Sequence, residues 1–469
     1  MKQHAHGQNS KRGKAKPAAG SKIEPHIKDH PLSHIIADAI IGLLLTGILL
    51  VGKIAAEHTQ VCKFMEESFY DLLQLRLSSK LDAETLKVIV VDIAGMRIDR
   101  HPRDPNYDFT DRTELLNLVQ QIAEQQPRGI AVDIDFTPYA NQRGQDRQFL
   151  DSCLSLYKPR SDSHMPAVPV YVGIHETVAL GPDLCLGEPR FRDLAAFIGF
   201  AHSRENEGRK RIADQLQITY LDTFEHQRIW YCPSLSSAVT QTHITLPSRW
   251  VAWALKPLSV VEDTGYKSSE FLIDYSPLEA IEKNTVSFQN IDSYLRKNAF
   301  YDKYVFIGRG QLSRNTGDKF PIPGRRSDSH AGVYIHACAA YTLLRGALFE
   351  LSGAGRLLLD VVLALFVIVG VALVRYHYRD RAGEVAYHRV FAFFTLLAVL
   401  LTVLIGFYMV DVTRLMWDDF VIVVVALLLH RSLEHKFDRI AQWAVRSVAD
   451  AWNALLNQED RTIRQRETR

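Results

Sequence analysis

Four carboxylates and one imidazole are the side chains of this sequence best placed to do chemistry together. Asp92 ends a β-branched run, and Asp133 and Asp135 end a second one. Asp318 and His336 lie near a later helical segment. The carboxyl ends of parallel strands meet at one edge of a sheet, where ligands bind. Because carboxylates that converge with an imidazole could hold a divalent cation or a cationic ligand, these five residues are the ligand-binding candidates.

A structural role for the same side chains stays open. An aspartate at a strand end can simply cap the following helix, and a histidine at a helix start can bond a loop carbonyl. Asp133 and Asp135 are two residues apart, and strand side chains alternate with period two. We therefore expect these two carboxylates to share one face of their strand and to be able to act together.

Catalytic motifs do not accompany these residues. The sequence has no Gly-x-Ser-x-Gly elbow, no His-Glu-x-x-His helix and no Gly-rich phosphate loop, and its other histidines lack metal-ligand spacing. The five cysteines are odd in number and far apart, which argues against a CxxC metal site. One disulfide among Cys153, Cys185 and Cys232 is an open alternative if that region lies outside the cytoplasm. We expect no enzymatic activity, and the pattern identifies neither a metal nor a cofactor.

The elements that must position the candidates follow an α/β pattern. The sequence predicts strands at 87–93, 129–136, 167–174, 271–275 and 304–308. It predicts helices at 110–125, 146–156, 233–242 and 331–345. Short β-branched runs that alternate with helical periodicity are typical of a domain built on a parallel sheet. We therefore predict a single large α/β domain over residues 55–355.

Four apolar runs flank or follow this domain, at 35–54, 356–374, 390–410 and 412–430. Each run is close to the about 20 residues that a helix needs to cross the hydrocarbon of a bilayer. We therefore predict four transmembrane helices. A buried soluble helix is the alternative for any single run, and a cleaved signal peptide is the alternative for the first.

Lysine and arginine are unevenly distributed between the connections. They are frequent in the segments 1–34, 375–389 and 431–469, whereas 411–419 holds one arginine beside three aspartates. By the positive-inside rule both termini face the cytoplasm and the large domain lies on the outer side. The basic segment 1–34 lacks an apolar period and is expected to be disordered. The net charge of +2 excludes a strongly basic nucleic-acid binder.

Several segments of the outer domain share a pattern with one known family. They are Val90–Ile93, Ala131–Phe136, Glu205–Arg211, Val305–Gly308, and Asp318 followed by Gly332–Ala337. The pattern resembles the second type of CHASE domain, an extracellular sensory domain of bacterial cyclases and histidine kinases, with one leading and three trailing spans. The chain departs from the family at Arg97–Asp104, where a Trp-Pro-rich turn is usual, and at Cys338, where asparagine is common. The resemblance implies a sensor of the bacterial inner membrane with a periplasmic α/β domain.

The output module that usually accompanies this family is not visible. After the last predicted span only 431–469 remains, which is too short for a kinase or cyclase domain. Apolar residues recur there at three- and four-residue spacing from Leu433 to Leu455, which predicts an amphipathic helix. That helix could bind a cytoplasmic signalling partner or a second copy of the chain, or lie along the membrane surface.

The function that these patterns favour is an extracytoplasmic sensor in a membrane. It would bind an unidentified ligand and transmit a conformational signal through its spans to a separate cytoplasmic partner. Two other classes stay open: a transport or assembly scaffold subunit, and a membrane-anchored metal-dependent hydrolase. The scarcity of charge inside the spans argues against the first, and the lack of a nucleophile or metal motif argues against the second.

Overall fold

The computed structural model describes most of the α/β domain and the two helices that follow it. The described residues are isolated positions between 47 and 74 and the ranges 86–100, 108–136, 143–158, 166–174, 188–199, 211–221, 227–242, 260–261, 266–310, 320–322, 325–378 and 384–417. Most of the first predicted span, the candidate Asp318, Cys185 and the predicted C-terminal helix lie outside these residues.

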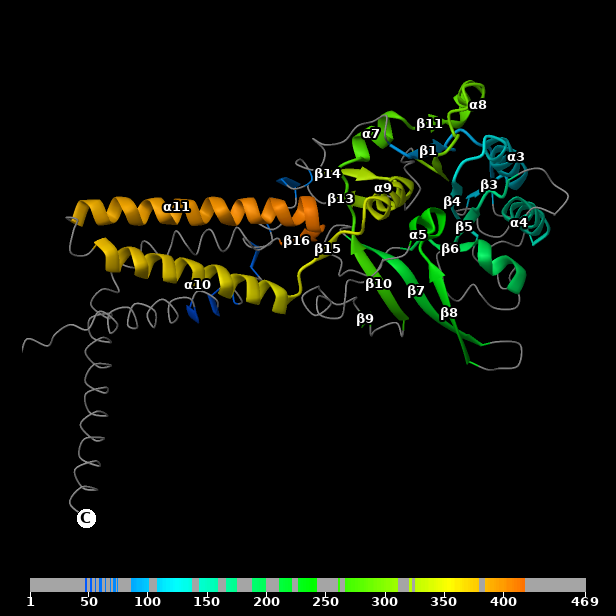
Figure 1. The fold of residues 1–469 in the computed structure, drawn as a ribbon. Coiled ribbons are helices and arrows are strands. Elements are labelled where there is room, and N and C mark those ends of the chain that lie inside the picture. Colours follow the sequence, from blue (N-terminus) through cyan, green and yellow to red (C-terminus); the bar gives the residue numbers. More distant parts are fainter. Residues whose placement is uncertain are drawn as a thin grey trace, which may run out of the picture.

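A parallel sheet forms the centre of the α/β domain (Figure 1). Its six strands, in spatial order, are β11 (Val286–Ser287), β1 (Val88–Asp92), β12 (Tyr304–Gly308), β4 (Gly129–Asp135), β5 (Val170–Ile174) and β6 (Ala195–Phe197). Every neighbouring pair is parallel. Such a sheet has both faces covered, so its central strands are continuous apolar runs, and this is why the sequence reveals them. The predicted α/β class is confirmed.

One face of the sheet is covered by α3 (Arg112–Ala123), α4 (Arg143–Tyr157) and α8 (Ile291–Leu295). Leu118 of α3 and Phe149 of α4 share a hydrophobic core with Val132 of β4. The start of α3 is fixed by Asp111, whose carboxylate accepts hydrogen bonds from the first backbone N–H groups of the helix. A cap residue followed by an apolar stripe is therefore sufficient to place this helix.

The opposite face is covered by α5 (Leu235–Thr240), α7 (Leu278–Lys283) and α9 (Gly332–Leu344). Residues 332–340 of α9 are all buried. The helix contacts β1 and β12 of the sheet as well as α5 and α7 of its own layer. A helix that is apolar on all sides belongs inside a domain, so α9 is the central helix of this layer.

A second, antiparallel sheet lies beside α5 (Figure 1). Its strands, in spatial order, are β8 (Gln227–Pro233), β7 (Arg211–Leu221), β10 (Tyr266–Leu272) and β9 (Val260–Val261). The smaller elements are β2 (Ile98–Arg100) paired with β3 (Asp108–Thr110), β13 (Phe320–Ile322) paired with β14 (Arg325–His330), and the short helices η4 (Pro189–Leu194) and η6 (Phe288–Asn290). Helix η4 leads directly into β6, and β8 contacts β6, so both border the parallel sheet.

Two long helices follow the domain, α10 (Gly353–Tyr378) and α11 (Glu384–Tyr408). Figure 1 shows them side by side, projecting from the domain. After α11 the chain returns to the domain through the π-helical turn η7 (Met409–Thr413). Strand β16 (Leu415–Met416) then pairs in parallel with β15 (Phe349–Glu350), the strand between α9 and α10.

The predicted transmembrane segments are described in part. Helix α10 contains the second segment, 356–374, and α11 contains the third, 390–410, as far as Tyr408. The fourth, 412–430, is described only to Trp417, and these first residues form the end of η7 and β16 instead of a helix that leaves the domain. Within the part of the chain that the structure describes, no helix is long and apolar enough to cross a membrane.

Candidate functional site

The predicted polar cluster lies at the carboxyl edge of the sheet, where β1, β4 and β12 end and α9 begins. Asp92 is the last residue of β1 and is buried. Its Oδ1 accepts hydrogen bonds from the backbone N–H groups of Ala94, at 3.0 Å, and Gly310, at 2.8 Å. These bonds hold the loops after β1 and β12 together and supply the donors that a buried carboxylate requires.

Two glycines allow α9 to rest on the strand ends. A Cβ at Gly308 would lie 2.9 Å from the Cβ of Val333 and 3.1 Å from the Cβ of Asp133. A Cβ at Gly310 would lie 2.6 Å from Oη of Tyr334. Atoms this close would repel each other, so only residues without a Cβ permit this approach. The glycine that closes the Val305–Gly308 motif is therefore a packing requirement.

His336 lies in the second turn of α9 and is 1% exposed. Its Nε2 is 3.2 Å from the carbonyl oxygen of Ile198 and 3.9 Å from Oδ1 of Asp133. A carbonyl oxygen can only accept a hydrogen bond, so Nε2 carries the proton in this contact. The imidazole therefore bonds the loop after β6 and lies near the carboxylate of Asp133 in β4.

Asp135 is the last residue of β4 and so also lies at the carboxyl edge of the sheet. The pairing of β4 with β5 is irregular between Val132 and Asp135. The expectation that Asp133 and Asp135 share one strand face stays a prediction beside this bulge. Asp318 lies outside the described residues.

The structure thus brings Asp92, Asp133, Asp135 and His336 to one edge of the sheet. Among the residues it describes, no group of three or more histidine, cysteine, aspartate or glutamate side chains is arranged to hold a metal ion. Ligand binding by the five sequence candidates stays a prediction.

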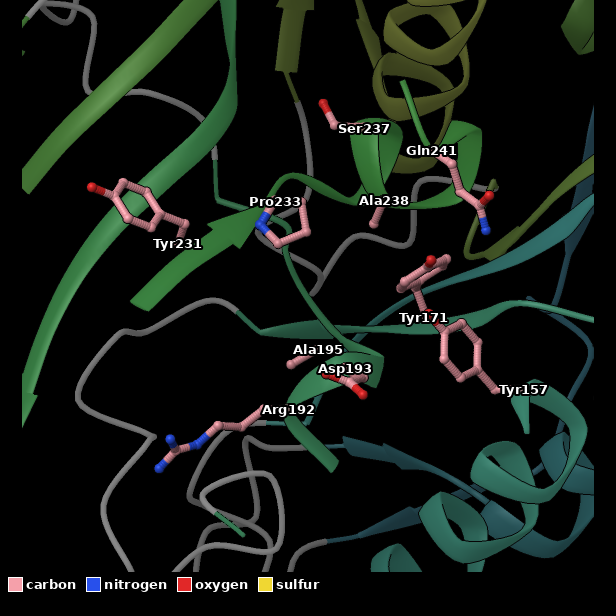
Figure 2. A pocket seen from close by; sticks show the side chains of 10 residues that line it. All are labelled: Tyr157, Tyr171, Arg192, Asp193, Ala195, Tyr231, Pro233, Ser237, Ala238 and Gln241. Carbon is pink, nitrogen blue, oxygen red and sulfur yellow. The ribbon is translucent and has the colours of Figure 1, made fainter. Parts of the chain in front are cut away.

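A cavity of about 410 Å³ opens at the opposite, amino edge of the sheet (Figure 2). This volume lies within the range of small-molecule sites. Six elements contribute to its wall, namely α4, β5, η4, β6, β8 and α5 with its C-cap. The lining residues are Tyr157, Tyr171, Arg192, Asp193, Ala195, Tyr231, Pro233, Ser237, Ala238 and Gln241.

Three tyrosines give the cavity its aromatic character. The rings of Tyr157 and Tyr171 meet edge to face, with centroids 6.0 Å apart and 72° between their planes. Figure 2 shows Tyr231 on the other side of the cavity from this pair. Burial raises the pKa of Tyr171, the neighbouring Tyr157 raises it further, and a hydrogen bond with Gln241 lowers it. Because the net change is a higher pKa, the phenol of Tyr171 is neutral at physiological pH and can donate a hydrogen bond.

Two consecutive residues of η4 bring charge to the cavity. In Figure 2 the carboxylate of Asp193 lies on the side of the tyrosine pair, and the guanidinium of Arg192 extends the other way. Oδ2 of Asp193 is 2.5 Å from Nζ of Lys158, just after α4, and this hydrogen bond raises the pKa of Lys158. Asp193 at this wall is therefore paired with Lys158.

Helix α5 connects the cavity to α9. Ser237 and Ala238 line the cavity, and the preceding Ser236 donates a hydrogen bond from Oγ to the carbonyl oxygen of His336 at 2.9 Å. All six residues of α5 are buried. A displacement of α5 would therefore act directly on α9.

The motifs at the carboxyl edge and the sheet that carries them agree with one protein family. Residues 40–374 match the family model of the CHASE2 domain. The chain belongs to the CHASE2 family. CHASE2 domains are extracellular sensory domains, so this part of the chain is a sensory domain. No curated protein and no solved structure matches the chain.

The sequence allows one disulfide within the CHASE2 domain, but the structure shows free thiols there. Cys153 and Cys232 are both free and fully buried. Every pair among Cys153, Cys185 and Cys232 includes one of these two residues, so none of the three possible disulfides is present. Burial raises the pKa of both thiols, which makes them poor nucleophiles.

The CHASE2 domain meets α10 and α11 at a junction formed by η7, β15 and β16. Trp417, which follows β16, is 0% exposed and lies in the same core as Leu343 of α9. Arg414 donates hydrogen bonds to the carbonyl oxygen of Gly346, at 3.2 Å, and to the fully buried carboxylate of Asp274, at 3.4 Å. The segment after α11 is therefore part of the core of the domain.

The cavity residues and the junction have no counterpart among the sequence candidates. Tyr171 lies within a predicted strand and Tyr157 follows a predicted helix. At such positions an aromatic side chain is expected to belong to the hydrophobic core. From the sequence alone, Arg414 is predicted to be a charged residue in the turn between two spans. In the sequence, the adjacent charges Arg192 and Asp193 between two strands are a signal of a polar site, but nothing in their spacing relates them to the tyrosines.

Proposed function

We propose that this chain is a membrane-bound sensor whose extracytoplasmic CHASE2 domain binds a small ligand and transmits its state through α10 and α11 to a separate cytoplasmic partner. The observation that carries the proposal is the junction. The backbone N–H of Phe349 donates to the carbonyl oxygen of Arg414 at 2.9 Å, and that of Leu351 donates to the carbonyl oxygen of Met416 at 3.2 Å. The start of α10 and the end of α11 are thereby attached to the domain at one point.

Helix α9 gives this point a direct connection to the sheet. It contacts β1 and β12, receives the hydrogen bond from α5, and is followed by β15 and α10. A packed core moves between discrete arrangements and does not deform continuously. A shift of α9 is therefore expected to move β15, and with it both long helices.

The surface of the two helices supports a membrane location. Their exposed large apolar side chains include Leu357, Leu358, Val362, Leu365, Phe366 and Val369 of α10 and Phe393, Leu396, Leu400 and Leu404 of α11. A patch of this kind is unfavourable in water and favourable against lipid. The C-terminal end of α10 and the start of α11 lie at the end far from the domain (Figure 1), and the sequence 375–389 carries the arginines that the positive-inside rule expects on the cytoplasmic side.

The topology is tested with reporter fusions to the full chain. A reporter inserted after Val410 should be on the outer side, because η7 lies against the CHASE2 domain. A reporter after Arg469 should be cytoplasmic. Alkaline phosphatase that is active at Arg469 would contradict the four-span arrangement.

Transmission is tested with spin labels at Tyr378 and Glu384, the residues that end α10 and begin α11. In the full chain in lipid nanodiscs, Arg414→Ala should shift or broaden the distance between the labels, because Asp274 is then buried without its cation. The control Arg128→Ala, which breaks an exposed ion pair at the amino edge of the sheet, should leave the distance unchanged. An unchanged distance in folded Arg414→Ala would argue against transmission through the junction.

A further inference from the structure

We propose that the tyrosine-lined cavity at the amino edge is a binding site for a small uncharged phenol. Treating the bound molecule as a signal rests on the proposed sensor function, whereas binding itself rests on the cavity alone. Its size, its aromatic wall and the pairing of its charged side chains all favour this class of ligand.

The size of the cavity sets the scale of the ligand. Its volume of about 410 Å³ lies toward the small end of the roughly 300–1,000 Å³ that small-molecule sites occupy. A molecule of one or two rings fits this volume, whereas a folded peptide does not. Side chains from six elements form the wall, so the cavity is present without a ligand.

The wall of the cavity is aromatic on two sides. Tyr171, which is 7% exposed, meets Tyr157 edge to face, and Figure 2 shows Tyr231 across the cavity from this pair. Between the two sides, in the same view, lie three small apolar residues, Ala195, Pro233 and Ala238. Aromatic rings gain from offset and edge-to-face contacts beyond the area that they bury. An aromatic ring therefore gains more from this wall than a saturated ring of the same size.

The charged side chains at the cavity are already engaged within the protein. Nζ of Lys158 binds the carboxylate of Asp193, and Arg192 likewise has an interaction within the chain. An ionic ligand would have to give up its hydration and compete with these existing contacts. The cavity therefore favours an uncharged ligand.

A hydrogen-bonding group suited to one hydroxyl lies beside the tyrosine pair. The phenol of Tyr171 is hydrogen-bonded with Gln241, and Figure 2 shows this amide beside the two rings. A side-chain amide has two donor hydrogens and an acceptor oxygen, so one bond does not exhaust it. A phenol needs partners for a single hydroxyl. A monosaccharide would need partners for several, and each hydroxyl that is buried without one is costly.

A bound phenol would act on the proposed transmission route through α5. Gln241 is the C-cap of this helix, and Ser237 and Ala238 also line the cavity. The adjacent Ser236 donates a hydrogen bond to the carbonyl oxygen of His336 in α9. A ligand that contacts Gln241 therefore contacts the helix that is bonded to α9.

Binding is measured by isothermal titration calorimetry on the full chain in nanodiscs, with phenol as the probe and protein-free nanodiscs as the blank. Cyclohexanol lacks the aromatic ring and should bind about threefold to tenfold more weakly than phenol. Benzoate carries a charge and glucose carries several hydroxyls, so both should bind about tenfold or more weakly. Three results would overturn the proposal: heat no larger than in the blank, equal affinity of cyclohexanol and phenol, or tighter binding of benzoate or glucose.

Variants then locate the site. Tyr231→Leu keeps an apolar side chain at a position that is 55% exposed, so the fold should be unaffected. It should weaken phenol about threefold or more and leave cyclohexanol unchanged, because only the aromatic contact is lost. Gln241→Asn should weaken both about threefold, because both carry a hydroxyl, and asparagine tolerates the left-handed backbone at this position.

The matched control is Tyr301→Leu. Tyr301 is 57% exposed and does not line the cavity, so this change should leave the affinity for phenol as it is. Unchanged affinity for phenol in both Tyr231→Leu and Gln241→Asn would overturn the assignment.

The spin-label distance separates the two proposals. Binding of phenol without any change between Tyr378 and Glu384 would support the ligand site and contradict transmission. No binding of phenol, together with the expected change in Arg414→Ala, would overturn the ligand site and support transmission.

Discussion

The two edges of the parallel sheet use polar residues in opposite ways. At the carboxyl edge, Asp92 and His336 are buried against backbone groups, and Gly308 brings α9 into direct contact with the strands. At the amino edge, Tyr171 and Arg192 face a cavity. Polar side chains at a strand end are thus not evidence of a site by themselves. The space around them decides whether a ligand can enter.

The largest effect that would test this contrast is expected from filling the closed edge. Gly308→Ala should lower the free energy of unfolding by about 2 to 3 kcal/mol, because the new Cβ would lie 2.9 Å from the Cβ of Val333. For a domain of this size each kcal/mol lowers Tm by roughly 2 to 4 °C, which circular dichroism of the full chain can follow.

The matched control for this change is Gly95→Ala. Its Cβ would lie 3.0 Å from Nε2 of Gln289, the end of a flexible side chain that can move away. The effect should stay below about 1 kcal/mol, since alanine also restricts the unfolded chain. Equal destabilisation by the two alanines would contradict a tightly filled carboxyl edge.

A smaller loss is expected from Asp92→Ala. The substitution leaves the N–H groups of Ala94 and Gly310 without their acceptor, which should cost about 1 to 2 kcal/mol. Asp92→Asn keeps an oxygen at the same place and should lose less. If Asp92 instead served mainly to bind a cation, both variants would keep the stability of the wild type, and a divalent cation would stabilise only the wild type.

The smallest effect on stability is expected at the open edge. Tyr171→Phe removes one hydroxyl beside a cavity and should change the free energy of unfolding by less than about 1 kcal/mol at pH 7. The folded-state pKa of Tyr171 lies above its ordinary value of about 10, so above that pH the unfolded chain releases a proton that the folded chain retains.

The stability that Tyr171 contributes is therefore complete below about pH 10 and is lost as the pH rises through the folded-state pKa. Tyr171→Phe should make the alkaline decline of Tm shallower than in the wild type. An identical alkaline decline would contradict a buried phenol at this position. Tyr301→Phe, at a tyrosine that is 57% exposed, is the control and should leave the Tm at pH 7 unchanged.

Much of the parallel sheet is predictable from the sequence because its strands are covered on both faces. The predicted strand 304–308 coincides with β12, and the predicted helix 331–345 differs from α9 by one residue at each end. The prediction 271–275 is displaced from β10 (Tyr266–Leu272). The apolar run there continues into the core after the strand has ended, while the polar residues 267–270 belong to an antiparallel strand.

The cavity and the junction are less predictable from the sequence, because their residues are far apart in the chain and only the fold brings them together. The candidates at the carboxyl edge follow from the parallel-strand rule, and the structure brings Asp92, Asp133, Asp135 and His336 to that edge. The cavity needs the packing of six elements, and the junction pairs Asp274 with Arg414 across 140 positions of the chain. No periodicity or spacing rule connects residues so far apart.

Hydrogen exchange of the full chain in nanodiscs, with and without phenol as a small aromatic probe for the tyrosine-lined cavity, tests the central contrast most directly. If the amino edge holds the ligand and α5 passes its state to α9, exchange should slow in residues 188–199, 235–241 and 332–344. The loops after β1 and β12, residues 93–96 and 309–310, should exchange as before. Slower exchange confined to those two loops, with α5 unchanged, would place the ligand at the carboxyl edge and contradict the account.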